Sequence, residues 1–255
     1  MITRATPFGL LAVTAAVTLG ACGGQERPAP TDGSTSSSPT SESSPTSTVT
    51  VTSAPEPETL DAPEQQELTR AQIIAALPAD GEGPEGFELT RKDVDVAADG
   101  SSDTDPEACS AATFDTREIR SWTTKHRTEG SGVRHEHRGG GNPTPSLVVS
   151  VWTHDRPYPT RFLDEAGAAM AQCASYEDNG TEWRTHNIAN PAVGDRSFAV
   201  RRSSTAINLT IDDLWVRSGH NLINVRLVSG PGPDSSDTLE EHAQGVLDDL
   251  TKATS

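Results

Sequence analysis

The sequence predicts an α+β fold: a single domain over residues 65–255, in which an antiparallel β-sheet is flanked by helices, after a disordered linker. Two observations lead to this prediction. Segments with helical and strand periodicity follow one another as helix, strands, helix, several hairpin strands and helix, without the strict alternation that is typical of parallel sheets. The chain before residue 65 has a composition that cannot form a packed core.

An apolar run over residues 8–21 follows the single positive charge of Arg4. Its length of about 14 residues is too short to cross a bilayer, which needs about 20, and is typical of the central region of a secretory signal. We therefore expect residues 1–21 to be a signal peptide. The alternative, a buried N-terminal helix, is disfavoured because Gly9 and Gly20 lower helix propensity.

Cys22 ends the stretch Leu19-Gly20-Ala21-Cys22, which resembles the lipobox of bacterial lipoproteins. The resemblance implies cleavage before Cys22 and a diacylglyceryl group on its sulfur atom. Two acyl chains hold a protein stably at a membrane where one is marginal. The expected location is the extracytoplasmic face of the cell membrane, with the lipid as anchor. The alternative is an ordinary signal peptide, after which Cys22 is a free or disulfide-bonded thiol.

Residues 22–64 are expected to form a disordered linker, since 16 of the 23 residues from Thr31 to Ser53 are Ser or Thr. Whether this segment is O-glycosylated or unmodified stays open. The chain has a net charge of −17, and loss of residues 1–21 removes only Arg4 and leaves −18. Such a charge disfavours nucleic acid as a partner, and anionic headgroups repel it, so membrane attachment needs the covalent anchor.

Cys109 and Cys173 remain once Cys22 is assigned to the lipid. Disulfides form in the space that an exported protein enters, and the even count makes Cys109–Cys173 the simplest pairing. The bridge would close a loop of 65 residues, for which chain entropy gives about 4 kcal/mol of stabilisation. The alternative is two free buried thiols.

Three segments have the apolar spacing of helices: residues 65–77, 160–176 and 237–252. The middle one carries Cys173 on its apolar stripe, which supports the disulfide. Asp237 and Glu240 predict a capping box at the start of the last helix. A helical or mixed stretch at 107–121 brings Cys109 toward the core.

Strands are expected at 86–96, 146–155, 183–189, 196–202, 205–217 and 221–229. The segment 146–155 is apolar on both faces, which predicts a central position in a sheet covered on both sides. Residues 126–138 are expected to form strands around a turn at Gly130–Gly132, residues 176–182 a polar turn, and residues 218–221 a hairpin turn. The changed phase of apolar residues after Ile211 predicts a bulge near Asp212 and Asp213.

Several short motifs resemble the PknH-type extracellular sensor domain of actinobacterial Ser/Thr kinases and stand-alone lipoproteins. These motifs are 75–89, Cys109, "AMAQC" at 169–173, "NPAVGDRSFAV" at 190–200 and "VRSGHNLINVRL" at 216–227. The resemblance implies an antiparallel sheet flanked by helices, with a cleft for an unknown ligand. The sequence departs from the kinase members by its one possible disulfide where they have two, and by its lack of a kinase domain.

His135 and His137 lie on the same side of a predicted strand, and two imidazoles at this spacing can bind zinc or copper, with His126 or His154 as a third ligand. A solvated strand end without metal is the favoured interpretation. The acidic segment 97–107 lacks EF-hand spacing and is expected to be a solvated loop. We therefore predict no metal, no cofactor and no catalytic residues.

Asp195 is expected to stabilise its own turn by accepting backbone hydrogen bonds. The tryptophans 122, 152, 183 and 215 could line a ligand cleft or pack in the core, and the core is favoured for Trp152.

The resulting functional hypothesis is a cell-surface lipoprotein whose non-catalytic domain binds or senses an unknown ligand or protein of the cell envelope. The alternatives are an envelope enzyme, with a site assembled from distant residues, and a lipid or glycolipid carrier.

Overall fold

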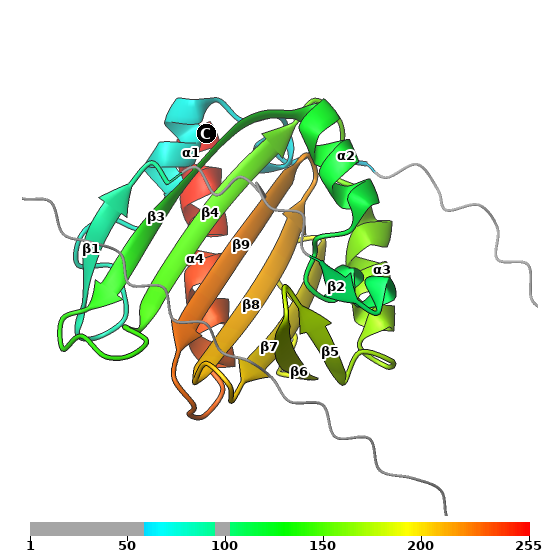
Figure 1. Cartoon of the computed structure of the whole chain (residues 1–255). Coiled ribbons are helices and arrows are strands. Elements are labelled where there is room, and N and C mark those ends of the chain that lie inside the picture. Colours follow the sequence, from blue (N-terminus) through cyan, green and yellow to red (C-terminus); the bar gives the residue numbers. More distant parts are fainter. Residues whose placement is uncertain (1–58, 95–102) are drawn as a thin grey trace, which may run out of the picture. The chain divides into compact units, whose positions relative to one another are not determined.

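The computed structural model describes residues 59–94 and 103–255 (Figure 1). The predicted signal peptide, Cys22, most of the linker and residues 95–102 of the acidic loop lie outside the described residues. None of the helices within the described residues is long and apolar enough to cross a membrane.

The core of the fold is one nine-stranded antiparallel sheet with the order β1-β3-β4-β9-β8-β7-β6-β5-β2. This confirms the predicted α+β class. The last strand of the chain, β9, lies between β4 and β8, so the centre of the sheet combines segments that are far apart in the sequence. The strands are β1 (Phe87–Lys92), β2 (Thr104–Asp105), β3 (Arg127–His137), β4 (Ser146–His154), β5 (Ser175–Asp178), β6 (Thr181–His186), β7 (Arg196–Ser204), β8 (Leu209–Ser218) and β9 (Asn221–Ser229).

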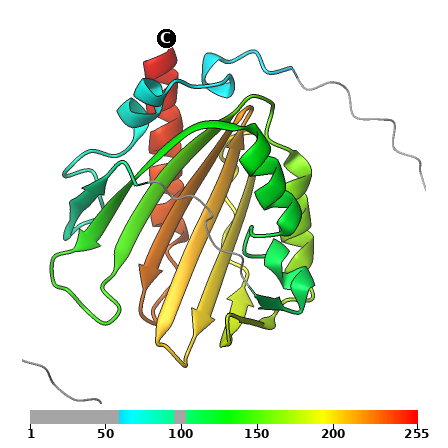
Figure 2. The same cartoon turned by 45° about the horizontal axis from the view of Figure 1, so that its top comes forward.

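Helices cover the two faces of the sheet differently (Figures 1 and 2). Helices α1 and α4 pack on one face over the centre of the sheet, whereas α2 and α3 lie on the other face toward β7. No helix of the described residues lies on the part of this second face over β3, β4 and β9. The helices are η1 (Pro63–Gln65), α1 (Arg70–Ala76), η2 (Glu107–Ala111), α2 (Arg117–His126), α3 (Thr160–Ala169) and α4 (Ser236–Thr254).

The apolar stripes of the sequence form the main core. Ile73 and Ala76 of α1 and Leu239 and Leu250 of α4 pack against alternate residues of β4, β8 and β9. Every residue of β4 is buried, which confirms that this strand is central in the sheet.

The helix expected at 160–176 is shorter, because α3 ends at Ala169. Cys173 therefore follows the helix, and the next residues form β5, which pairs with β6 through a turn at Asn179 and Gly180. The expected polar turn at 176–182 is thus a β-hairpin. Its register places Tyr176 opposite Trp183, and both side chains are buried.

The expected turn at Gly130–Gly132 is wrong, since β3 is continuous through these residues. A Cβ atom on Gly130 would lie 2.6 Å from the Trp152 side chain, and one on Gly132 would lie 2.7 Å from the Ser150 hydroxyl. The close approach of β4 side chains therefore explains both glycines, and no turn in the chain is needed to account for them.

The bulge expected near Asp212 and Asp213 is also absent, because β8 pairs with β7 and β9 without a register shift. Both faces of β8 are buried, so apolar residues occupy both phases of the strand. The capping box expected at Asp237 is wrong as well: the N-cap of α4 is Ser235, whose backbone N–H donates to Asp212 Oδ2 at 3.1 Å.

Candidate functional site

The disulfide Cys109–Cys173 joins η2 to the segment between α3 and β5, with 5.5 Å between the two Cα atoms. Both cysteines are fully buried and pack with Ala112, Ala169 and Trp183. The predicted pairing is confirmed, and the bridge fastens η2 to the segment that leads into the β5–β6 hairpin.

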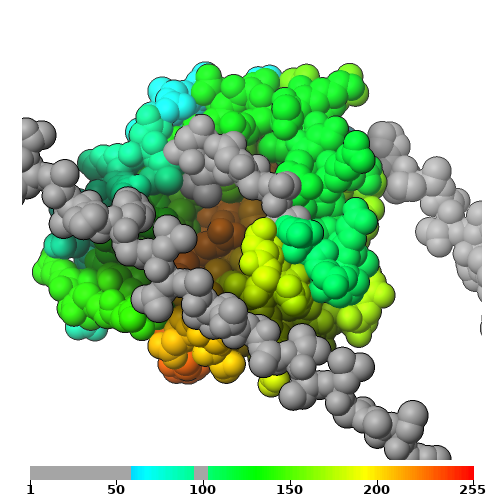
Figure 3. Space-filling view, in the orientation of Figure 1, coloured from blue at the N-terminus to red at the C-terminus, as the bar shows by residue number. Residues whose placement is uncertain are grey.

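The part of the sheet face opposite α1 and α4 that α2 and α3 leave uncovered is called the open face here. Figure 3 shows it hollowed, with the orange atoms of β8 and β9 at the bottom between green β3–β4 and the yellow strands. The residues of this face are polar at its centre, and they are Arg134, Ser150, Asp213, Asn224 and Arg226.

The Asp213 carboxylate is the centre of a buried ion network on this face. Arg226 Nε donates to Asp213 Oδ1 at 2.7 Å, and Arg202 Nη2 donates to Asp213 Oδ2 at 2.9 Å. The Asn224 side-chain amide also donates to Oδ1, at 3.2 Å. Burial acts to raise the pKa of Asp213, but the charges and hydrogen bonds of Arg226 and Arg202 outweigh it and hold this pKa below its ordinary value.

The donors of this face that are buried without a hydrogen-bond partner among the described residues include Ser150 Oγ, Arg134 Nε and Arg202 Nε. A buried donor without an acceptor costs about 1–3 kcal/mol. Such groups are therefore candidates to contact a ligand or an ordered water. The outer parts of Arg134 and Arg226 are accessible, with side-chain exposures of 37% and 29%.

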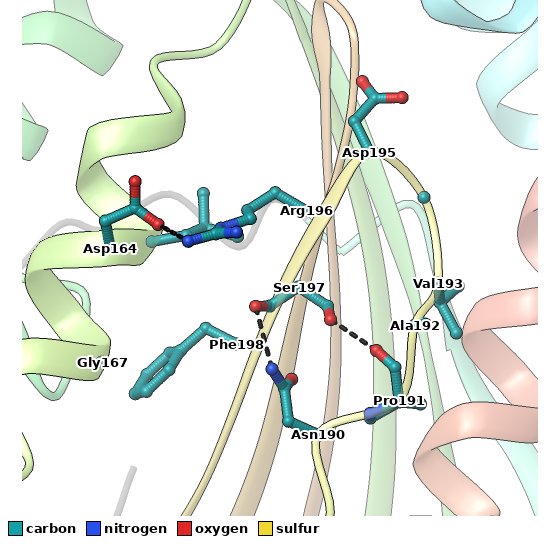
Figure 4. Close-up of a pocket in the computed structure, with 12 residues that line it drawn as sticks. Asp164, Gly167, Asn190, Pro191, Ala192, Val193, Asp195, Arg196, Ser197 and Phe198 are labelled. Atoms are coloured by element: carbon teal, nitrogen blue, oxygen red, sulfur yellow. Dashed lines mark hydrogen bonds and ion pairs between the residues drawn. The ribbon is translucent and has the colours of Figure 1, made fainter. Parts of the chain in front are cut away.

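A second hollow of about 530 Å³ lies between α3 and the segment before β7 (Figure 4). Its wall is the "NPAVGDRSF" motif. The polar groups of its wall are already bonded to each other: Arg196 pairs with Asp164, Asn190 donates to the Ser197 carbonyl, and the Ser197 hydroxyl donates to the Pro191 carbonyl. The open face, with its unpaired donors, is therefore the better candidate site.

Asp195, beside this second hollow, has a wider structural role than the expected one. Its carboxylate accepts hydrogen bonds from Gln65, from Arg217 Nη1 and from the backbone N–H of Gly219. It thus joins the entry to the domain to the β8–β9 turn. Gly194 has a φ of +66°, and its Cβ position lies 2.3 Å from the Arg217 carbonyl oxygen, so only glycine fits there.

His135 and His137 do not form the expected solvated strand end, because His135 is fully buried. Its Nε2 lies 3.1 Å from the Ala79 carbonyl oxygen, beneath Gly83. His137 stays at the end of β3, where its Nδ1 accepts the N–H of Gly139. No group of three or more His, Cys, Asp or Glu side chains within residues 59–94 and 103–255 has the geometry to hold a metal ion.

His126 and His154, the two histidines considered as a third metal ligand, lie near α2 and away from His135. His126 Nδ1 contacts Asp155 Oδ1 at 2.7 Å, and His154 Nδ1 contacts the His220 carbonyl at 2.9 Å. The tryptophans belong to the core: Trp152 and Trp215 stack with ring centroids 6.0 Å apart, Trp183 packs beside the disulfide, and Trp122 is partly buried against α3.

The sequence contains one signal that would have found the ion network. Asp213 and Arg226 are charged residues in the middle of strands that are rich in apolar residues, and buried charges are rare unless they are paired. The bulge prediction assigned Asp213 to an irregularity and missed this meaning.

Comparisons with known proteins find a likeness in structure alone. No family model matches the chain. No curated protein matches it either. The crystal structure of the extracellular domain of PknH from Mycobacterium tuberculosis is similar with a TM-score of 0.52 and 11% identity, over 74% of this chain and 99% of that one. A Mycobacterium smegmatis protein, the Rv0999 ortholog, has a TM-score of 0.40 and 11% identity, over 66% of this chain and 90% of that one.

The PknH likeness shows that the described part of the chain has the fold of an extracellular domain of the PknH type. The disulfide is of the kind that forms in oxidising, extracytoplasmic spaces.

Proposed function

We propose that this chain is a lipid-anchored protein of the outer face of the cell membrane, and that its domain binds an envelope ligand on the open face without transforming it. The likeness to the PknH extracellular domain supports a sensor-like role. The lipobox-like stretch that ends at Cys22 supports the anchor.

The observation that carries the binding proposal is the polar centre of the open face. Ion networks on sheets are normally covered or fully paired, because unpaired buried polar groups are costly. Here the network reaches the accessible side chain of Arg226, and Ser150 Oγ is buried without a partner among the described residues. A ligand with acceptor atoms would satisfy these donors.

Intact-mass analysis of protein extracted from its native membranes tests the anchor. We expect loss of residues 1–21 and addition of a diacylglyceryl group at Cys22, and we expect Cys22→Ser to prevent the lipid addition. A native chain that retains Met1 with an unmodified Cys22 would refute the anchor.

Amide chemical-shift mapping tests the binding face, on the chain from residue 22 with Cys22→Ser. The probes are soluble muropeptides and vesicles of phosphatidylglycerol. Shifts confined to β3, β4, β8 and β9 are expected, whereas shifts around the second hollow would contradict this choice of site. Chemical conversion of a probe would favour an enzyme, and extraction of phospholipid from the vesicles would favour a carrier.

A further inference from the structure

We propose that the open face binds an oxyanion, a phosphate or carboxylate group, through the arginine row formed by Arg91, Arg134 and Arg226. This inference rests on the proposed function, because it takes the open face as the binding site. It adds the chemical class of the group that is recognised.

The register of the sheet places the arginine row on one line across the strands. Arg91 of β1 is opposite Arg134 of β3, and Arg134 is opposite Val148 of β4. Val148 is in turn opposite Arg226 of β9, which is opposite Asp213 of β8. Directly opposite residues of a regular antiparallel ladder point to the same face, so Arg134, Val148, Arg226 and Asp213 share the open face. Arg91 is opposite Arg134 at a register shift that follows Leu89.

The charges of this line are unbalanced. Like charges directly opposite each other destabilise a sheet, yet Arg91 and Arg134 occupy such a pair. Among the described residues, Arg91 makes no ion pair, whereas Arg134 pairs with Glu136, whose Oε1 lies 3.7 Å from Nη1. Asp213 is already shared by Arg202 and Arg226. Three arginines thus gather in a chain whose net charge is −17, two of them in ion pairs and Arg91 in none among the described residues.

The spacing of the row brings two guanidinium groups within reach of one anion. Two strand spacings separate the backbones of Arg134 and Arg226, a distance of about 10 Å, and Val148 between them is short. Guanidinium groups that extend from both sides can therefore approach one group above Val148. Their planar fork of N–H donors matches phosphate and carboxylate oxygens.

Ser150 provides an independent observation. It is two residues along β4 from Val148 on the same face, it is fully buried, and its Oγ has no partner among the described residues. A hydroxyl in this position donates to an oxygen acceptor held by the row. The cluster therefore combines cationic donors with a neutral donor, which is the composition of an oxyanion site.

The experiment measures binding of inorganic phosphate and of acetate by amide chemical shifts, on the chain from residue 22 with Cys22→Ser and at constant ionic strength set with NaCl. We expect saturable shifts in β3, β4 and β9 with at least one of the two anions. The double variant Arg91→Gln/Arg134→Gln should weaken this binding at least tenfold. Arg184→Gln, an exposed arginine of β6 outside the row, is the matched control and should leave it unchanged.

Thermal unfolding separates ligand binding from a structural role. If the row exists for an anion, the double variant should unfold at the same or a higher temperature in anion-free buffer, because it relieves repulsion. A large decrease in the unfolding temperature would assign the arginines to the fold and overturn the inference. Arg134→Lys retains the charge without the fork and should bind with intermediate affinity.

The source of the anion is distinguished by sedimentation with vesicles of phosphatidylglycerol and of phosphatidylcholine. Arginine-dependent binding to the first alone identifies a lipid headgroup, whereas binding of the free anion alone identifies a soluble ligand. If muropeptides shift the open face but neither anion nor vesicle binds, the proposed function stands and the oxyanion inference falls. Anion binding that the double variant does not weaken also refutes the inference.

Discussion

Replacing Asp213 with asparagine removes the carboxylate that both Arg202 and Arg226 contact. The Arg202 side chain is only 8% exposed, so its charge is left buried without the counter-charge that holds it. Removing one partner of a buried ion pair typically costs about 3–5 kcal/mol, and we expect a loss of this size for Asp213→Asn. Arg226 is partly exposed and can turn to water, so it adds little to the loss.

The assay is urea unfolding followed by tryptophan fluorescence, which reports on the stacked indoles of the core. The matched control is Asp164→Asn, which breaks the pair of Asp164 with Arg196. Both side chains of that pair are about half exposed, and exposed pairs contribute less than about 1 kcal/mol. The double variant Arg202→Met/Asp213→Leu should recover much of the loss, because apolar side chains often replace buried pairs without cost. Equal losses for Asp213→Asn and Asp164→Asn would refute this reasoning.

Three further predictions concern stability. Changing both Cys109 and Cys173 to serine should lower the free energy of unfolding by about 4 kcal/mol in urea, and reductant should then have no further effect; a loss below about 1 kcal/mol would contradict the loop-closure argument. Gly194→Ala should destabilise the protein by about 2 kcal/mol or more, because the φ of Gly194 is +66° and the new Cβ atom would lie 2.3 Å from a carbonyl oxygen. The control Gly245→Ala, in open space on α4, should stabilise the protein by about 0.5–1 kcal/mol. The opposite order would show that the backbone readily adapts at Gly194. Burial lowers the pKa of the His154 imidazole to about 4, so on acidification the unfolded chain takes up this proton near pH 6.5 and the folded chain only near pH 4. The free energy of unfolding should therefore decrease by about 3 kcal/mol as the pH falls from 6.5 to 4. Urea titrations at both pH values measure this decrease, and His154→Asn should remove it.

Local patterns were sufficient for much of the fold. The apolar periodicity of α1, α4, β4 and β9 was correctly assigned, because each of these elements buries a face that its own residues define. The cysteine count was likewise enough to predict the disulfide. Errors arose where a neighbouring element decided the conformation. The glycines of β3 were wrongly interpreted as a turn. The side chains that require them, Trp152 and Ser150, come from another strand, which local sequence does not reveal.

The candidate site depended on tertiary structure almost entirely. The sequence by itself determined that Arg91, Arg134, Arg226 and Asp213 lie in strands or beside them, and that charged residues there need partners. Only the folded sheet decided that they share one line, because β9 enters between β4 and β8. Pairing between segments about 80 residues apart is set by long-range packing and register, which short-range periodicity does not encode.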